Sequence, residues 1–157
     1  MDNIKFARNL VKGKIAETVF AQMLRETRDF TVLEFGYEKV IPELVQQDYK
    51  GNSEMIETLR TAPDFAVINR KTKEVKLIEV KYMHTLNFEY ILKYAKRMSQ
   101  SWNPSYLFIS TLDGFYFDEI NKIIKNKGKI ELLKHPQIKE ELQMKYLQIL
   151  IDFEKNN

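Results

Sequence analysis

Hydrophobic residues recur at helical spacing in three parts of the chain. The first predicted helix runs from Ile4 to Arg28, and its apolar positions are Leu10, Val11, Ile15, Val19, Phe20, Met23 and Leu24. The second is amphipathic, runs from Asn87 to Trp102, and is ended by Asn103-Pro104. The third runs from Pro136 to Phe153, with one stripe formed by Ile138, Leu142, Tyr146, Ile149 and Phe153.

Segments rich in β-branched and aromatic residues lie between these helices and predict strands. The predicted strands are Phe30–Val40, Asp64–Asn69, Val75–Tyr82, Tyr106–Ser110 and Phe115–Phe117. The polar turn Arg70-Lys71-Thr72-Lys73 joins the second and third strands into a hairpin, and Asp113-Gly114 marks another turn. Shorter helices are expected from Ser53 to Leu59, inside an irregular insertion (Ile41–Ala62), and after a capping Asp118 through Ile124.

The order of these elements is helix, three strands, helix, one or two strands, and then further helices. This order predicts an α/β fold in which a central mixed sheet is flanked by helices, with an additional helix at the C-terminus. The length of 157 residues fits a single domain over residues 1–157, and 5 glycines and 4 prolines offer no flexible linker that would divide it.

Composition narrows the class of protein without identifying it. Apolar residues make up 44% and charged residues 30%, which is typical of a globular chain. The absence of cysteine excludes disulfides, thiolate zinc sites and cysteine nucleophiles. There is no signal peptide and no apolar run of the roughly 20 residues that span a bilayer, so we expect a soluble, cytoplasmic protein without a membrane partner. The formal charge of +3 permits nucleic-acid binding but does not require it.

The hairpin brings three charged side chains together. If its turn is symmetric about the Lys71–Thr72 bond, Asp64 lies opposite Glu79, and directly opposed residues project to the same face of a sheet. Strand periodicity places Lys81 on the face of Glu79, while the apolar residues between them point the other way. The sequence therefore predicts that Asp64, Glu79 and Lys81 converge.

Two facing carboxylates repel each other, and a divalent cation between them would remove the repulsion. Mg²⁺ prefers oxygen ligands; it can polarise a phosphate and lower the pKa of a bound water. Lys81 could then neutralise developing negative charge. The alternative is a surface hairpin on which Glu79 and Lys81 are simply solvated, because a Glu-x-Lys pattern on a strand is common by chance.

A third carboxylate, Glu17, falls inside the apolar stripe of the first predicted helix. Its neighbours on the helical wheel are apolar, and Gly13, one turn earlier, would let another chain or a ligand approach. Carboxylates among apolar residues are rare unless they are paired or bind a metal. Glu17 is therefore a candidate for the acidic cluster, and the alternative is a boundary residue paired with Lys14.

Three short motifs together resemble the PD-(D/E)XK nuclease superfamily. They are Glu17 on an N-terminal helix, Pro63-Asp64, and Glu79-Val80-Lys81 on the following strand. The pattern looks most like the compact restriction-endonuclease-like and Holliday-junction-resolvase-like branch, whose members share an αβββαβ core. The resemblance extends over about residues 12–110.

The resemblance implies a Mg²⁺- or Mn²⁺-dependent endonuclease that hydrolyses phosphodiester bonds, with DNA as the expected partner. It implies that Asp64 and Glu79 bind the metal, that Glu17 and the Val80 carbonyl are further ligands, and that Lys81 assists the nucleophile. The alternatives that stay open are a nuclease fold that binds nucleic acid or protein without cutting, and an enzyme that acts on RNA.

The helix after the Glu-Val-Lys strand departs from the family pattern. Several members carry a glutamine and a tyrosine four residues apart there, and no matching glutamine is present here. The helix instead offers Tyr90, Lys93, Tyr94 and Arg97 on one face, which could contact phosphates and stack on bases or could pack on the sheet.

We also expect a homodimer if the substrate is duplex or branched DNA, because one acidic cluster attacks one strand. Leu147, Leu150 and Ile151 flank the main stripe of the last helix and could face a partner, or could complete the core of the monomer.

Overall fold

The chain folds around one five-stranded mixed sheet. The computed structural model describes residues 3–36 and 53–156. The strands lie in the order β1 (Phe30–Glu34), β2 (Phe65–Asn69), β3 (Val75–Tyr82), β4 (Tyr106–Ser110) and β5 (Phe115–Glu119). Strands β3 and β4 pair in parallel, and the other neighbours are antiparallel. The predicted α/β class with a mixed sheet is confirmed.

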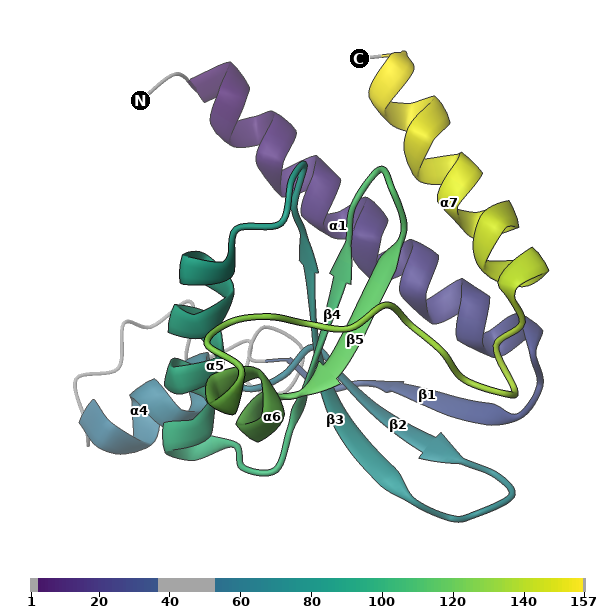
Figure 1. The fold of residues 1–157 in the computed structure, drawn as a ribbon. Helices are drawn as coiled ribbons and strands as arrows, with labels where there is room; N and C mark the ends of the chain where they lie inside the picture. Colours follow the sequence, from purple (N-terminus) through teal and green to yellow (C-terminus); the bar gives the residue numbers. More distant parts are fainter. Residues whose placement is uncertain (1–2, 37–52, 157) are drawn as a thin grey trace.

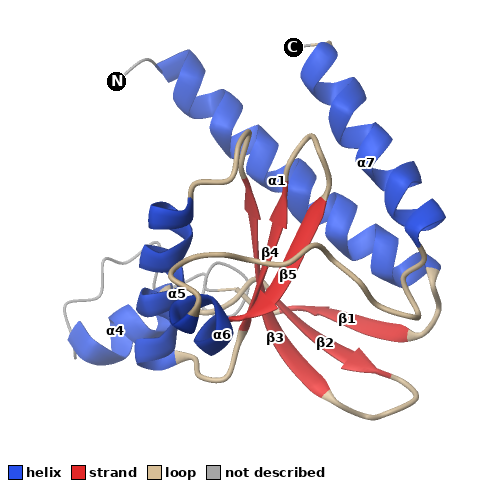
Figure 2. Cartoon of the chain, viewed as in Figure 1, coloured by secondary structure: helices blue, strands red, loops and turns tan. Residues whose placement is uncertain are grey.

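Helices cover both faces of this sheet (Figures 1 and 2). They are α1 (Asn3–Glu26), α4 (Ser53–Arg60), α5 (Phe88–Ser101), α6 (Ile120–Lys125) and α7 (Glu140–Lys155). Helices α1 and α7 lie side by side against one face, and α5 packs with α6 on the other (Figure 1). Among the described residues, no helix is long and apolar enough to cross a bilayer.

The alternation of side chains along β4 separates the two halves of the core. Phe108 points toward α1, where the ring of Phe20 packs between it and Phe65 at centroid distances of 4.8 and 5.2 Å. Leu107 and Ile109 point to the opposite face and pack with α5 and α6. Both faces of the central strands are therefore buried, which holds β3 rigidly in the middle of the molecule.

The hairpin register agrees with the prediction from its turn. Phe65 pairs with Ile78 and Ala66 with Leu77, as symmetry about the Lys71–Thr72 bond requires. The predicted helices at α1 and α5 and the strand β4 are also found, each within about two residues of its predicted ends, as is the short helix that begins at Ser53. Strand β1 ends at Glu34, and residues 37–52, which include much of the predicted insertion, lie outside the described residues.

Two predicted helix starts are wrong. Asp118 does not cap α6, because β5 continues through it; Glu119 is the cap and accepts a hydrogen bond from the Asn121 amide at 3.2 Å. The last helix begins at Glu140 rather than at Pro136, because the preceding residues form a bridge between His135 and Ile138.

Leu147, Leu150 and Ile151 do not form a partner-facing surface on α7. Leu147 and Leu150 are buried in the monomer's core, and Ile151 packs against it. Ile149, which was expected in the core stripe, is instead about half exposed. Leu147, Leu150 and Ile151 therefore belong to the core of the monomer, and they lend no support to a dimer.

Candidate active site

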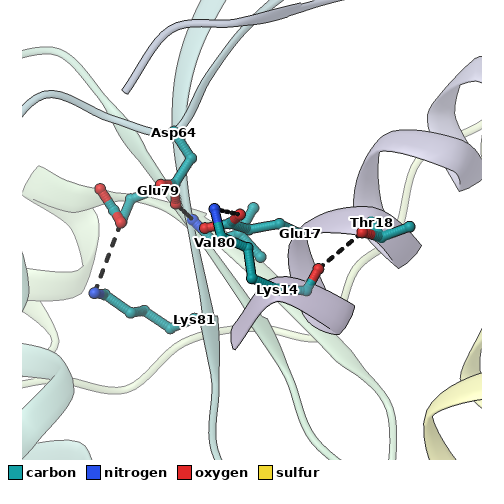
Figure 3. A network of polar contacts seen from close by, with 7 residues as sticks. All are labelled: Lys14, Glu17, Thr18, Asp64, Glu79, Val80 and Lys81. Carbon is teal, nitrogen blue, oxygen red and sulfur yellow. Dashed lines mark hydrogen bonds and ion pairs between the residues drawn. The ribbon is translucent and has the colours of Figure 1, made fainter. Parts of the chain in front are cut away.

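A cleft of about 700 Å³ opens where β1 ends and β2 begins. One wall is α1, and the other is formed by the end of β1, the end of α4 and the first residues of β2. Three predicted site residues, Glu17, Asp64 and Glu79, line it. Figure 3 shows Glu17 reaching toward Asp64 and Glu79 from α1, with Lys81 beside Glu79.

The backbone of β3 orients the Asp64 carboxylate. The paired residues of β2 and β3 end at Phe65 and Ile78, and the chain bends at Asp64, just before β2. Beyond the end of this ladder, the Val80 amide donates to Asp64 Oδ2 at 2.9 Å (Figure 3). This bond holds the Asp64 side chain beside Glu79, the residue that precedes Val80 in β3.

Asp64 lies close enough to Glu79, just beyond the last paired residues of β2 and β3, for its charge to act on the Glu79 carboxyl. The Glu79 side chain is only 16% exposed. Burial, and next the negative charge of Asp64, raise the pKa of Glu79 well above its ordinary value, although the Lys81 amine 3.6 Å away opposes this. The sequence-based prediction that Asp64, Glu79 and Lys81 converge on one site is therefore confirmed.

Glu17 shows features of both interpretations made from the sequence. Its carboxylate pairs with the Lys14 amine at 3.3 Å, as expected for a boundary residue. It also belongs to the acidic cluster, because burial and then the charge of Asp64 raise the pKa of Glu17 despite this ion pair. The three carboxylates thus carry more negative charge than the adjacent lysines neutralise.

Lys81 is held by an aromatic side chain on α5. Its amine lies 4.3 Å from the centre of the Tyr94 ring, and the Tyr94 hydroxyl is 3.0 Å from that of Tyr90. Burial lowers the pKa of Lys81, but the negative charges of Glu79 and Asp64 act against it and the pKa is raised. Lys81 therefore stays protonated at neutral pH.

The other two predicted residues of the α5 face do not line the cleft. Lys93 and Arg97 are exposed on α5, whereas Tyr94 packs against Lys81 and Tyr90 follows Tyr94. Of the face expected to meet nucleic acid, only Tyr94 therefore contacts a predicted site residue, Lys81, and Tyr90 contacts Tyr94.

The donor set suits a hard cation that keeps several waters. Within the part of the chain that the structure describes, no three His, Cys, Asp or Glu side chains are grouped closely enough to hold a metal ion. Mg²⁺ sites, however, commonly use one or two carboxylates and complete their shell with water and phosphate oxygens. Asp64 and Glu79 supply such a pair of oxygen donors.

The sequence interpretation missed most of the cations that surround the carboxylates. Arg25 and Arg60 line the same cleft, as does Lys14, which was considered only as a partner for Glu17. Lys14 and Arg25 are three turns apart on one predicted helix, so the sequence could have shown that they lie on the same face of α1. Nothing local to Arg60 indicates that α4 returns to this cleft.

No protein-family model and no curated protein sequence matches the chain.

Proposed function

We propose that this chain is a metal-dependent nuclease that hydrolyses phosphodiester bonds, with DNA as its expected substrate. The observation that carries the proposal is that Asp64, Glu79 and Glu17 line one open cleft, with the Lys81 amine 3.6 Å from Glu79. Such a cluster is unfavourable for folding, because burial and then the charge of Asp64 raise the pKa values of Glu17 and Glu79. Strongly perturbed carboxyl groups in a cleft are typical of functional sites.

Asp64 and Glu79 would hold Mg²⁺ or Mn²⁺, and the Val80 carbonyl is a further oxygen donor at the same place. The metal would lower the pKa of a bound water and polarise the phosphate. Glu17 adds a third carboxylate from the opposite wall and can accept a hydrogen bond from a water in the cleft.

Lys81 supplies a fixed positive charge for the negative charge that develops on the phosphate during hydrolysis. Its raised pKa keeps it charged, and the Tyr94 ring limits the positions of its amine. A preorganised charge of this kind costs no reorganisation at the moment of reaction. Tyr94 therefore acts as a positioning residue for Lys81.

The principal alternative is a nuclease fold that binds nucleic acid or protein without cutting. The presence of three carboxylates and a partly buried lysine favours catalysis, because these charges are costly to keep in a protein that only binds. An RNA-directed nuclease is the second alternative, and it would use the same groups.

The deciding experiment is incubation of the protein with labelled single-stranded, duplex and branched DNA and with RNA, in Mg²⁺, in Mn²⁺ and in EDTA. We expect cleavage of at least one DNA substrate that requires the metal and is lost in Lys81→Ala. Lys71→Ala, in the exposed β2–β3 turn, is the matched control and should cut normally. Binding without cleavage under every condition would favour the silent module, and cleavage of RNA alone would change the substrate.

A further inference from the structure

The cleft extends along α1 well beyond the acidic cluster. Its lining on this helix begins at Asn9 and ends at Arg25, which is about 24 Å of helix at 1.5 Å per residue. Glu17 lies halfway along this length, so the cleft has an arm on each side of the carboxylates. A single phosphate at the acidic cluster would leave both arms unused.

Basic side chains line the cleft on both sides of the carboxylates. Lys14 and Arg25 are three helical turns apart on one face of α1, about 16 Å along the axis. One guanidinium nitrogen of Arg25 donates to the Val32 carbonyl at 3.2 Å, which orients the group and leaves other N–H donors for a ligand. Arg60 adds a cation on the opposite wall, at the end of α4.

Two glycines line the cleft at places where the fold itself does not call for glycine. Apart from its chain neighbours and the backbone of its own helix, no atom of the described residues lies within 4 Å of a Cβ placed at Gly13, although glycine in a helix interior lowers helix stability. A Cβ at Gly36 would make only ordinary contacts, the nearest at 3.7 Å with Asp64 Cα. Glycine at such positions leaves room for a ligand to approach the backbone closely.

We propose that α1 is a track for one polynucleotide strand, which lies along the helix with its phosphates at Lys14 and Arg25 and passes closest to the backbone at Gly13. This inference rests on the proposed function, because it places the scissile bond at Asp64 and Glu79 between the two cations. At the 3.4 Å rise of a stacked strand, about 16 Å corresponds to at most about five nucleotides, and a more extended strand would span it with fewer. The track predicts that a strand unpaired over this length binds more tightly than a duplex.

The track is tested by binding of a labelled single-stranded DNA to Gly13→Ala and Arg25→Ala, measured by fluorescence anisotropy in EDTA so that no cleavage occurs. Gly13→Ala should melt at or above the wild-type temperature, because alanine favours the helix and meets no described atom. It should nevertheless bind DNA about tenfold more weakly, because its methyl group occupies space that the strand needs. A lower melting temperature, or wild-type affinity, would overturn the close approach at Gly13.

The salt dependence of DNA binding by Arg25→Ala tests the proposed contact between Arg25 and a phosphate. The variant should reduce the slope of log affinity against log salt concentration by about 0.7, the value for one phosphate of a single strand, while Lys71→Ala leaves the slope unchanged. An unchanged slope in Arg25→Ala, or equally strong binding of a polyglutamate peptide, would overturn the track. If the wild-type protein cuts DNA and these variants match it, the track fails alone; if it neither binds nor cuts any nucleic acid, the proposed function fails with it.

Discussion

Replacing Asp64 by asparagine should stabilise the folded protein at neutral pH, although it removes a residue of the proposed active site. After burial, the charge of Asp64 is the largest cause of the raised pKa of both Glu17 and Glu79. Asparagine removes that charge and keeps a side-chain oxygen that can accept the Val80 amide, now bonded at 2.9 Å. The hydrogen bond that orients residue 64 should therefore survive while the repulsion disappears.

The size of the effect follows from the geometry of the pair. Opposed Cβ atoms are about 5 Å apart, and two unit charges at that distance interact by about 3 kcal/mol at an effective dielectric constant of 20. The Lys81 amine, 3.6 Å from Glu79, and proton uptake by the glutamates compensate much of this. We therefore expect a gain of about 1 kcal/mol in the free energy of unfolding, which raises the melting temperature by about 2–4 °C in a chain of this length.

The gain should depend on pH with a definite sign. Glu17 and Glu79 have pKa values above the ordinary 4.5, so they bind protons more tightly in the folded than in the unfolded state. Their contribution to stability is present below pH 4.5 and is lost as the pH rises through their folded pKa values. The advantage of Asp64→Asn should consequently be small near pH 4 and largest near pH 8.

Thermal unfolding followed by circular dichroism in EDTA, at both pH values, measures this directly. Asp113→Asn is the matched control, because Asp113 is exposed in the β4–β5 turn, outside the cleft, and its loss of charge should change the melting temperature little. Two results would refute the reasoning: an Asp64→Asn variant that is no more stable than the wild type at pH 8, or one that is stabilised equally at pH 4 and pH 8.

Three further predictions concern activity and metal binding. Lys81→Ala should lower the single-turnover cleavage rate by about 10²–10³-fold while the protein stays folded, and a wild-type rate would remove Lys81 from the mechanism. Glu17→Gln should stay folded but lose most cleavage, because the amide preserves shape without charge; full activity would make Glu17 a structural residue. Mn²⁺ should raise the melting temperature of the wild type, by the equivalent of about 2.7 kcal/mol at a hundredfold excess over Kd, and not that of Asp64→Asn. An equal shift in both proteins would place the metal elsewhere.

The parts of the site that were predictable from sequence depend on local geometry. A tight turn sets the register of the strands it joins, so the four-residue link before Glu74 was enough to predict the pairing of Phe65 with Ile78, and with it the approach of Asp64 to Glu79. Strand periodicity then placed Lys81. Glu17 was found because a carboxylate interrupts an apolar helical stripe, which is again a pattern within one element.

The errors arose where a residue's environment is set by distant segments. Apolar residues occur on several sides of α7, so periodicity could not select the face that packs on the core, and Leu150 rather than Ile149 is buried. In the same way, nothing near Tyr94 in sequence indicates that its ring will lie against the Lys81 amine. That contact exists because β3, α5 and β4 form a crossover whose helix returns over the strand.

The motif Pro63-Asp64 shows how a weak sequence signal gains meaning from the fold. A proline followed by an aspartate at the start of a strand is common, and by itself it predicts nothing about chemistry. In the structure, the ladder of β2 and β3 ends at Phe65 and Ile78, and beyond that end the Val80 amide donates to Asp64 Oδ2 at 2.9 Å. This bond fixes the Asp64 carboxylate next to Glu79, which precedes Val80 in β3. The aspartate, the glutamate and the backbone amide that follows the glutamate therefore act as one unit, which is placed by the point at which strand pairing ends.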